Sequence, residues 1–163
     1  MGDVNSIWDV VLLARHGETL WNLQGRRQGR ADSELTAEGR EQAGHHGIAL
    51  RDSGIDAVFV SPLGRAVATA GVIGDALGIR PEVVDDFAEL DHGDLTGLTE
   101  DEITASHSGE WRRRAADRYG WRFPSGESYA DVDLSLSFNR ACLARPCACR
   151  SAVSFLDSGT ALA

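Results

Sequence analysis

The chain contains no lysine. Each of its 16 basic residues is arginine, and 25 acidic residues outnumber them, for a formal net charge of -9. We read the missing lysine as a mark of a GC-rich coding sequence, without functional weight. The excess of acidic residues argues against a nucleic-acid surface, because phosphate backbones require excess positive charge. A small phosphorylated ligand stays compatible, since a few arginines in a cleft can produce a local positive field.

Long apolar runs are also missing. No stretch approaches the roughly 20 residues of a membrane-spanning helix, and the N-terminus lacks the charged-then-apolar layout of a signal peptide. Cys142, Cys147 and Cys149 are an odd set of cysteines without a nearby histidine, so a zinc site is not expected. We therefore expect a cytoplasmic protein with no metal or other cofactor and no membrane partner.

Apolar segments alternate with helix-like segments along most of the chain. Strands are expected at residues 8–14, 57–60 and 82–84. Helices are expected at 37–50, with Thr36 as N-cap, and at 64–77, stopped by Gly78. A short helix should open at Thr99. This alternation predicts a parallel sheet covered by helices, hence an α/β domain.

Polar side chains follow each expected strand. His16 follows the first strand, Arg65 lies in the first turn of the helix after the second, and Glu89 comes after the third. In open α/β sheets ligands bind beyond the carboxyl ends of the strands. We therefore expect these three side chains to converge.

The residue types at these positions fit phosphoryl chemistry. Neutral imidazole is a competent nucleophile at physiological pH, and Arg15 beside His16 supplies a planar fork for phosphoryl oxygens. An Arg-His pair by itself is also common in surface turns. Arg65 favours the phosphate interpretation, because a helix N-terminus itself attracts phosphate.

Glu89 is the candidate for proton transfer to a departing oxygen, because a carboxyl near a bound dianion holds its proton longer. Asp91 and Asp94 are rivals by residue type alone. His92 could be a second catalytic imidazole, but we interpret it as a residue that packs within the loop.

Five blocks in order carry a family resemblance. They read RHGET at 15–19, RQGRADSELTAEGREQA at 27–43, SPLGRAVATA at 61–70, ELDHGDLTGLTEDEI at 89–103 and PSGESYADV at 124–132. Together they resemble the histidine phosphatase superfamily, in its phosphoglycerate-mutase-like branch, over about residues 8–132. The resemblance implies a three-layer α/β/α fold with a mostly parallel central sheet, in one domain over residues 1–163.

The resemblance also implies a two-step mechanism that needs no metal. His16 would be the nucleophile that becomes phosphohistidine, and Glu89 would be the general acid and then the base for water. Arg15 and Arg65 would clamp the phosphoryl oxygens. The residues expected to bind the substrate are Arg15, Asn22, Gln28, Gly29 and Arg65.

The C-terminal segment departs from the family. The family has a second active-site histidine in a His-Gly pair after a central strand, yet no histidine follows His107. Residues 152–160 are the best placed equivalent, and this alignment puts Asp157 at the histidine position. Residues 133–163 also contain all the cysteines and no glutamate, and apolar residues alternate strand-like over 132–138. We expect a frame-shifted or degenerate segment, a sheet that lacks its central strand and exposes the edge of the first, and impaired turnover.

Three functions remain open. The first is a phosphomonoester hydrolase acting on a small phosphorylated substrate. The second is phosphotransfer of the phosphoglycerate mutase type, which the short Gln28-Gly29 region disfavours. The third is a catalytically inactive protein that binds a phospho-ligand. Substrate specificity should lie in residues 99–125, where we expect the basic residues 112–114 to form a solvated helix face rather than a substrate contact.

Overall fold

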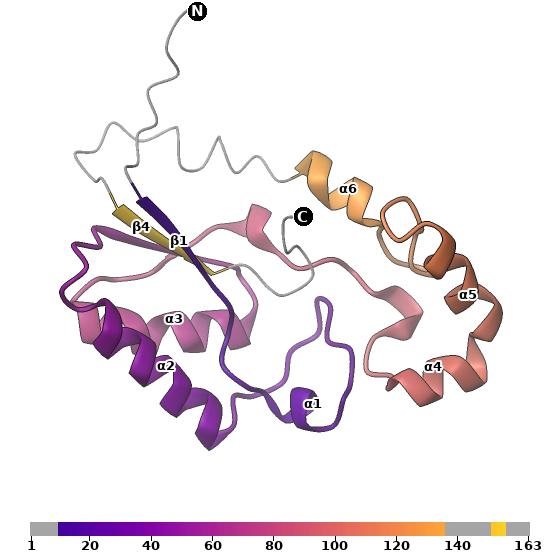
Figure 1. The fold of residues 1–163 in the computed structure, drawn as a ribbon, viewed down its shortest axis with the longest axis horizontal. Helices are drawn as coiled ribbons and strands as arrows, with labels where there is room; N and C mark the ends of the chain where they lie inside the picture. The colour runs from indigo at the N-terminus through magenta and orange to yellow at the C-terminus, as the bar shows by residue number, and fades with distance from the viewer. Residues whose placement is uncertain (1–9, 136–150, 156–163) are drawn as a thin grey trace, which may run out of the picture.

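The sheet of the computed structural model has four parallel strands in the order β1-β4-β2-β3. The structure describes residues 10–135 and 151–155. The strands are β1 (Val10–Ala14), β2 (Ala57–Val60), β3 (Glu82–Val83) and β4 (Ser151–Phe155). Because all of them run the same way, their carboxyl ends share one edge of the sheet. Figure 1 shows β1 and β4 side by side in this direction. The expected α/β fold with a parallel sheet is confirmed.

Strand β4 corrects the expectation that the central strand is lost. It lies between β1 and β2, with Ala152 beside Val11 on one side and beside Ala57 on the other. Five residues of sequence SAVSF form this strand, and their backbone groups pair with β1 and β2 in register. The β1 edge that was expected to be bare is therefore paired with β4. The rest of the atypical segment, residues 136–150 and 156–163, lies outside the described residues.

Two helices, α2 (Ala37–Leu50) and α3 (Gly64–Leu77), pack against each other beneath the sheet (Figure 1). The hydroxyl of Thr36 accepts a hydrogen bond from the Gly39 amide and caps α2. Gly78 ends α3 with φ 70°, a left-handed conformation that glycine adopts at little cost. Both helices and their boundary residues were expected from the sequence.

The first hydrophobic core fills the space between the sheet and this helix pair. Its buried members are Ala43, Val58, Val60, Ala66, Ala70 and Ile73. Small residues on facing helices let the two backbones approach closely. Leu12 and Ala14 of β1 pack against the same core, which fixes the strand end from which the polar loop departs.

A second group of helices gathers apart from the first (Figure 1). It consists of α4 (Glu100–Ser106), α5 (Ser108–Ala116) and α6 (Tyr129–Ser135). Its buried core contains Leu90, Leu95, Ile103, Phe123 and Val132. Thr99 caps α4 as expected, in a reciprocal capping box with Glu102. Leu90 and Leu95 carry the loop with Glu89 into this core.

Helix α6 corrects the strand interpretation of the alternating pattern that begins at Val132. Residues 129–135 are helical. Ser128 donates from its amide (2.7 Å) and hydroxyl to Asp131 Oδ2, and the Asp131 amide donates to Ser128 Oγ at 3.3 Å. This reciprocal Ser-x-x-Asp bonding starts a helix, and it overrides a period-two pattern. The remainder of that pattern lies beyond residue 135, outside the described residues.

A short helix that the sequence analysis missed, α1 (Leu20–Leu23), interrupts the loop after β1. The Thr19 hydroxyl caps it, and Asn22 Oδ1 accepts from the Thr19 amide at 3.0 Å. The Thr-x-x-Asn spacing is the signal that could have predicted this helix. Asn22 is therefore held in place by the cap.

Candidate active site

His16 lies directly after β1, in the turn Arg15-His16-Gly17. Its side chain is buried, with 7% exposed. The ring Nδ1 lies 2.7 Å from the carbonyl oxygen of Gly17. A carbonyl oxygen only accepts, so Nδ1 carries the proton and, in the neutral ring, Nε2 carries the lone pair. The turn therefore fixes the tautomer that leaves the lone pair on Nε2.

Thr69 joins the His16 turn to helix α3. Its hydroxyl accepts from the Gly17 amide at 3.0 Å and donates to the Arg65 carbonyl at 2.8 Å. Thr69 has no exposed surface, so no water competes for these bonds. The turn with His16 and the start of the helix with Arg65 are thus linked through one buried side chain.

Arg65 is held by the loop before α2, with only 2% of the residue exposed. One terminal nitrogen (NH2) donates to the Gly29 carbonyl at 2.8 Å. The other (NH1) donates to the Ala31 carbonyl at 2.7 Å and to Asp32 Oδ1 at 3.2 Å. Asp32 also accepts from the amides of Gly64 (2.5 Å) and Arg65 (3.1 Å). Its carboxylate therefore caps α3, where the preceding residue offers no side-chain cap.

A pocket of about 400 Å³ opens beside this turn. Its lining includes every expected site residue except His16, which is the neighbour of Arg15 in the chain. The expected residues in the lining are Arg15, Asn22, Gln28, Gly29, Arg65 and Glu89. The structure thus brings six of the seven expected residues to one pocket, although they come from separate stretches of the chain.

Glu89 is the acidic residue of its loop that reaches the pocket. It is 7% exposed, and its Oε1 accepts from the Leu90 amide at 2.9 Å. The rival carboxylates bond elsewhere: Asp91 accepts from the Gly93 amide, and Asp94 accepts from the Ser125 hydroxyl. Neither rival lines the pocket, so the geometry separates three residues that their type could not.

His92 both lines the pocket and packs in the loop. Its ring stacks on Phe123, with centroids 4.6 Å apart and planes at 24°. A Cβ at Gly29 would lie 3.0 Å from His92, and Gly29 has φ 54°. Glycine is therefore required at position 29 both for its backbone conformation and for this close approach.

The pocket lining also includes residues that were not expected from the sequence to bind substrate. They are Arg26, Arg27, His92, Glu100, Trp111, Arg114, Arg118 and Tyr129. The Trp111 ring lies beneath the guanidinium groups of Arg27 (4.6 Å) and Arg114 (4.7 Å), and its Nε1 donates to Glu100 at 2.7 Å. The expectation of a purely solvated face fits Arg112 and Arg113, which do not line the pocket. It is wrong for Arg114, which shares the pocket-facing side with Trp111 at helical spacing i, i+3.

The described part of the chain contains no group of histidine, cysteine and acidic residues that could hold a metal ion. No helix within that part combines the length and apolar character needed to cross a membrane. The three cysteines and Asp157, the position aligned with the family's second histidine, lie outside the described residues.

Proteins similar in sequence to this chain carry names that fit the phosphoglycerate-mutase-like branch, which the five motif blocks resemble. The protein named "Probable phosphoglycerate mutase GpmB" from Erwinia tasmaniensis is 41% identical over 123 residues, which cover 75% of this chain and 57% of that protein. Its namesake from Enterobacter sp. is 38% identical over 138 residues, which cover 83% of this chain and 64% of that protein. The chain thus spans less than two thirds of the length of these relatives.

Solved structures share the fold. The alpha-ribazole phosphatase from Shigella flexneri superimposes with a TM-score of 0.82 at 24% identity, over 91% of this chain and 74% of that one. The mycobacterial glucosyl-3-phosphoglycerate phosphatase in complex with VO3 gives a TM-score of 0.80 at 31% identity, over 91% and 76%. The sequence profile of the histidine phosphatase superfamily (branch 1) matches residues 11–134. Because this match covers most of the chain, the chain belongs to the histidine phosphatase superfamily, branch 1.

Proposed function

We propose that this protein hydrolyses a small phosphate monoester through a phosphohistidine intermediate at His16. The observation that supports this best is the pocket beside the His16 turn, where Arg15, Arg65 and Glu89 meet. On the side of the nucleophile, phosphoryl transfer through histidine needs the nucleophile itself, two guanidinium groups and one carboxyl.

In the first step, Nε2 of His16 attacks phosphorus and the bond from phosphorus to the ester oxygen breaks. Arg15 and Arg65 stabilise the charge that spreads over the equatorial oxygens. Glu89 gives its proton to the departing oxygen, so an alcohol leaves and the phosphoryl group stays on His16. The hydrogen bond between Nδ1 and Gly17 holds the ring in the reactive tautomer.

In the second step, water attacks the phosphorus of phosphohistidine. Glu89, now a carboxylate, takes a proton from this water as its oxygen bonds to phosphorus. The bond between Nε2 and phosphorus breaks, and inorganic phosphate leaves. The step returns His16 and Glu89 to their starting protonation states, so no external acid, base or metal is consumed.

The charge in the pocket favours a substrate that carries anionic groups. Two glutamates, Glu89 and Glu100, line the pocket against six arginines: Arg15, Arg26, Arg27, Arg65, Arg114 and Arg118. This surplus of positive charge inside a chain of net charge -9 attracts small anions to the cleft. Guanidinium groups cover the Trp111 ring, so less of the ring face is left for an aromatic leaving group to stack on.

Release of phosphate from 4-nitrophenyl phosphate tests the proposal. His16→Ala should remove turnover, whereas His45→Ala, an exposed histidine on α2, should leave the rate unchanged. Rapid quenching should trap an acid-labile phosphoryl group on the wild type and not on His16→Ala. Equal rates for wild type and His16→Ala would exclude hydrolysis through His16.

The names of the two relatives support a second candidate, phosphoglycerate mutase activity. With 3-phosphoglycerate as substrate, ³¹P NMR separates the two reactions, since a mutase produces 2-phosphoglycerate and a hydrolase produces inorganic phosphate. A protein that only binds phospho-ligands would do neither, yet vanadate would still raise its melting temperature.

A further inference from the structure

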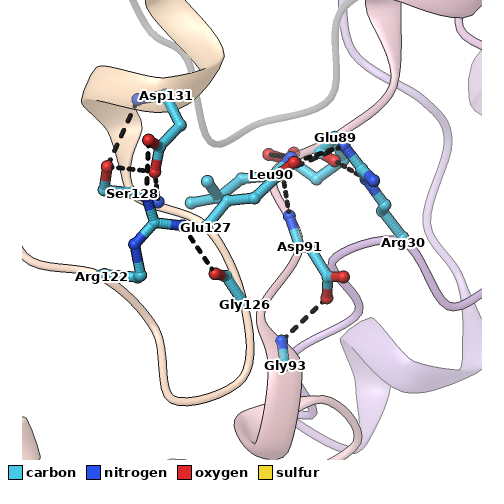
Figure 2. Close-up of polar contacts among 10 residues, drawn as sticks. All are labelled: Arg30, Glu89, Leu90, Asp91, Gly93, Arg122, Gly126, Glu127, Ser128 and Asp131. Atoms are coloured by element: carbon cyan, nitrogen blue, oxygen red, sulfur yellow. Dashed lines mark hydrogen bonds and ion pairs between the residues drawn. The ribbon is translucent and has the colours of Figure 1, made fainter.

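One ion pair outside the pocket, Arg30 with Glu127, joins three stretches of chain that are distant in sequence. Arg30 belongs to the loop before α2, and Glu127 belongs to the loop before α6. Between them runs the segment that carries Glu89 (Figure 2). The second nitrogen of the Arg30 fork (NH2) lies 2.8 Å from Glu127 Oε1 and 3.0 Å from Oε2, so one donor contacts both carboxylate oxygens.

The same two side chains hold the backbone on both sides of Leu90. Arg30 Nε donates to the carbonyl oxygen of Glu89 at 3.1 Å. Glu127 Oε2 accepts from the Asp91 amide at 3.0 Å, and the Glu127 amide donates to the Asp91 carbonyl at 3.0 Å. The peptide groups at 89 and 91 are therefore fixed from outside the pocket, while the Leu90 side chain is buried in the second core.

The carboxyl of Glu89 depends on this backbone for its direction. Its Oε1 accepts from the Leu90 amide at 2.9 Å, and this amide belongs to the same peptide group as the Glu89 carbonyl that Arg30 holds. A shift of residues 89–91 therefore turns the carboxyl within the pocket. A displacement of about 1 Å in a reacting group is enough to cost roughly 10²-fold in rate.

Stability alone does not account for the pair. The Arg30 side chain is 49% exposed and that of Glu127 is 28% exposed. Ion pairs this exposed contribute little to the free energy of unfolding. Their bonds nevertheless converge on the two peptide groups that flank Leu90, which is where the direction of Glu89 is set.

We propose that Arg30 and Glu127 are positioning residues that aim the Glu89 carboxyl at the ester oxygen. This inference rests on the proposed function, in which Glu89 moves the proton. The pair itself touches neither the substrate nor the phosphoryl group. Its removal should impair proton transfer to the leaving alcohol and should leave the attack by His16 intact.

Leaving-group dependence tests this. 4-Nitrophenol leaves readily without a proton, whereas an alkyl alcohol such as glycerol needs one, and general acids contribute about 10²- to 10⁴-fold to such steps. Glu127→Gln and Arg30→Gln should therefore lower kcat/KM, which reports the step that expels the alcohol, at least about tenfold more on glycerol phosphate than on 4-nitrophenyl phosphate. A variant that merely loosens the fold would lower both rates by the same factor.

Arg122→Gln is the matched control. Arg122 forms an ion pair of 2.7 Å with Asp131 in the same region and donates to the Gly126 carbonyl (Figure 2). These bonds do not reach residues 89–91, so the loss of Arg122 should affect both esters equally. If Arg122→Gln discriminated between the esters as strongly as Glu127→Gln, general loosening of the loop would be the cause and the proposal would be overturned.

Glu89→Gln separates this inference from the proposed function. If Glu89→Gln shows no preference for the better leaving group, the acid role in the proposed function fails. If Glu89→Gln lowers the rate more on glycerol phosphate than on 4-nitrophenyl phosphate and Glu127→Gln does not, only the positioning role fails.

If the wild type does not turn over, the amide NMR signal of Leu90 tests the positioning role instead. This signal reports the hydrogen bond to the Glu89 carboxylate and should move in Glu127→Gln and Arg30→Gln but not in Arg122→Gln. An unmoved Leu90 signal would overturn the proposal.

Discussion

Gly17 and Gly39 lie in direct backbone contact, and neither position has room for a side chain. A Cβ at Gly17 would overlap the Gly39 carbonyl oxygen and would lie 2.8 Å from its carbonyl carbon. A Cβ at Gly39 would overlap the Glu18 carbonyl oxygen. The first turn of α2 is therefore packed against the turn that carries His16.

We expect Gly17→Ala to lower the free energy of unfolding by about 1–3 kcal/mol, because overpacking forces the two backbones apart. It should also lower the rate, since His16 moves with the turn. Gly44→Ala is the matched control on α2. A Cβ there meets nothing within 4 Å, and replacing a helical glycine should stabilise by about 0.5–1 kcal/mol. Urea denaturation measures both, and equal effects would contradict the prediction.

Thr69→Val should destabilise the protein by about 1–3 kcal/mol. Valine keeps the shape of threonine but leaves the buried Gly17 amide without its acceptor. Thr69→Ser keeps the hydroxyl and should retain most of the stability and the rate. A valine variant as active and stable as the serine variant would show that the Gly17 bond does not hold the turn.

Asp32→Ala should cost about 0.5–2 kcal/mol of stability, the usual effect of removing a helix cap. Its carboxylate caps α3 through the Gly64 and Arg65 amides and also contacts the Arg65 guanidinium. Glu34→Ala removes a carboxyl of the same loop that bonds none of these groups, and its effect should stay within about 0.5 kcal/mol. Thermal melts of the two variants side by side provide the measurement.

The carboxyl of Glu102 should titrate below its ordinary range. The backbone amide of Thr99 lowers the pKa of Glu102 most, followed by a side-chain hydrogen bond from Arg26. Stability from this group is complete above the unfolded pKa of about 4.3 and is lost as the pH falls through the lower folded pKa. Glu102→Gln should therefore lose less stability than wild type on acidification below about pH 5. A ¹³C-detected titration midpoint of Glu102 at or above about 4.3 would contradict the prediction.

Restoring a second histidine should raise turnover by about 10²- to 10³-fold, the usual worth of one preorganised donor. Our alignment places the histidine at Asp157, but the family's His-Gly order would place it at Ser158, directly before Gly159. Asp157→His and Ser158→His serve as controls for each other with 4-nitrophenyl phosphate as substrate. If neither raises kcat, the absence of a histidine at these positions does not limit turnover.

Elements with local signals were predicted well from the sequence. Thr36, Gly78 and Thr99 mark helix ends through bonds within a few residues, and the structure places the ends there. The Ser128 and Asp131 pair is a signal of the same kind. The alternation after Val132 indicated a strand instead, but a few alternating residues cannot outweigh a helix cap and a buried helix face.

The candidate site was predictable only where the chain itself aligns residues with strand ends. His16, Arg65 and Glu89 follow strands and were found in this way. Trp111 and Arg114 reach the pocket because a separate helix group packs beside it, which no local pattern indicates. The role of Asp32 as the cap of α3 is likewise a contact between segments 32 residues apart.

The place of β4 also affects how the sheet can assemble during synthesis on the ribosome. Among the described strands, β1 and β2 do not pair with each other; each pairs with β4. Until residues 151–155 have been translated, β1 has no strand to join, and the pair of β2 with β3 stands apart from it. A premature stop before that stretch would therefore leave β1, the strand that ends at the His16 turn, without a strand partner, although every described residue that lines the pocket had already been made.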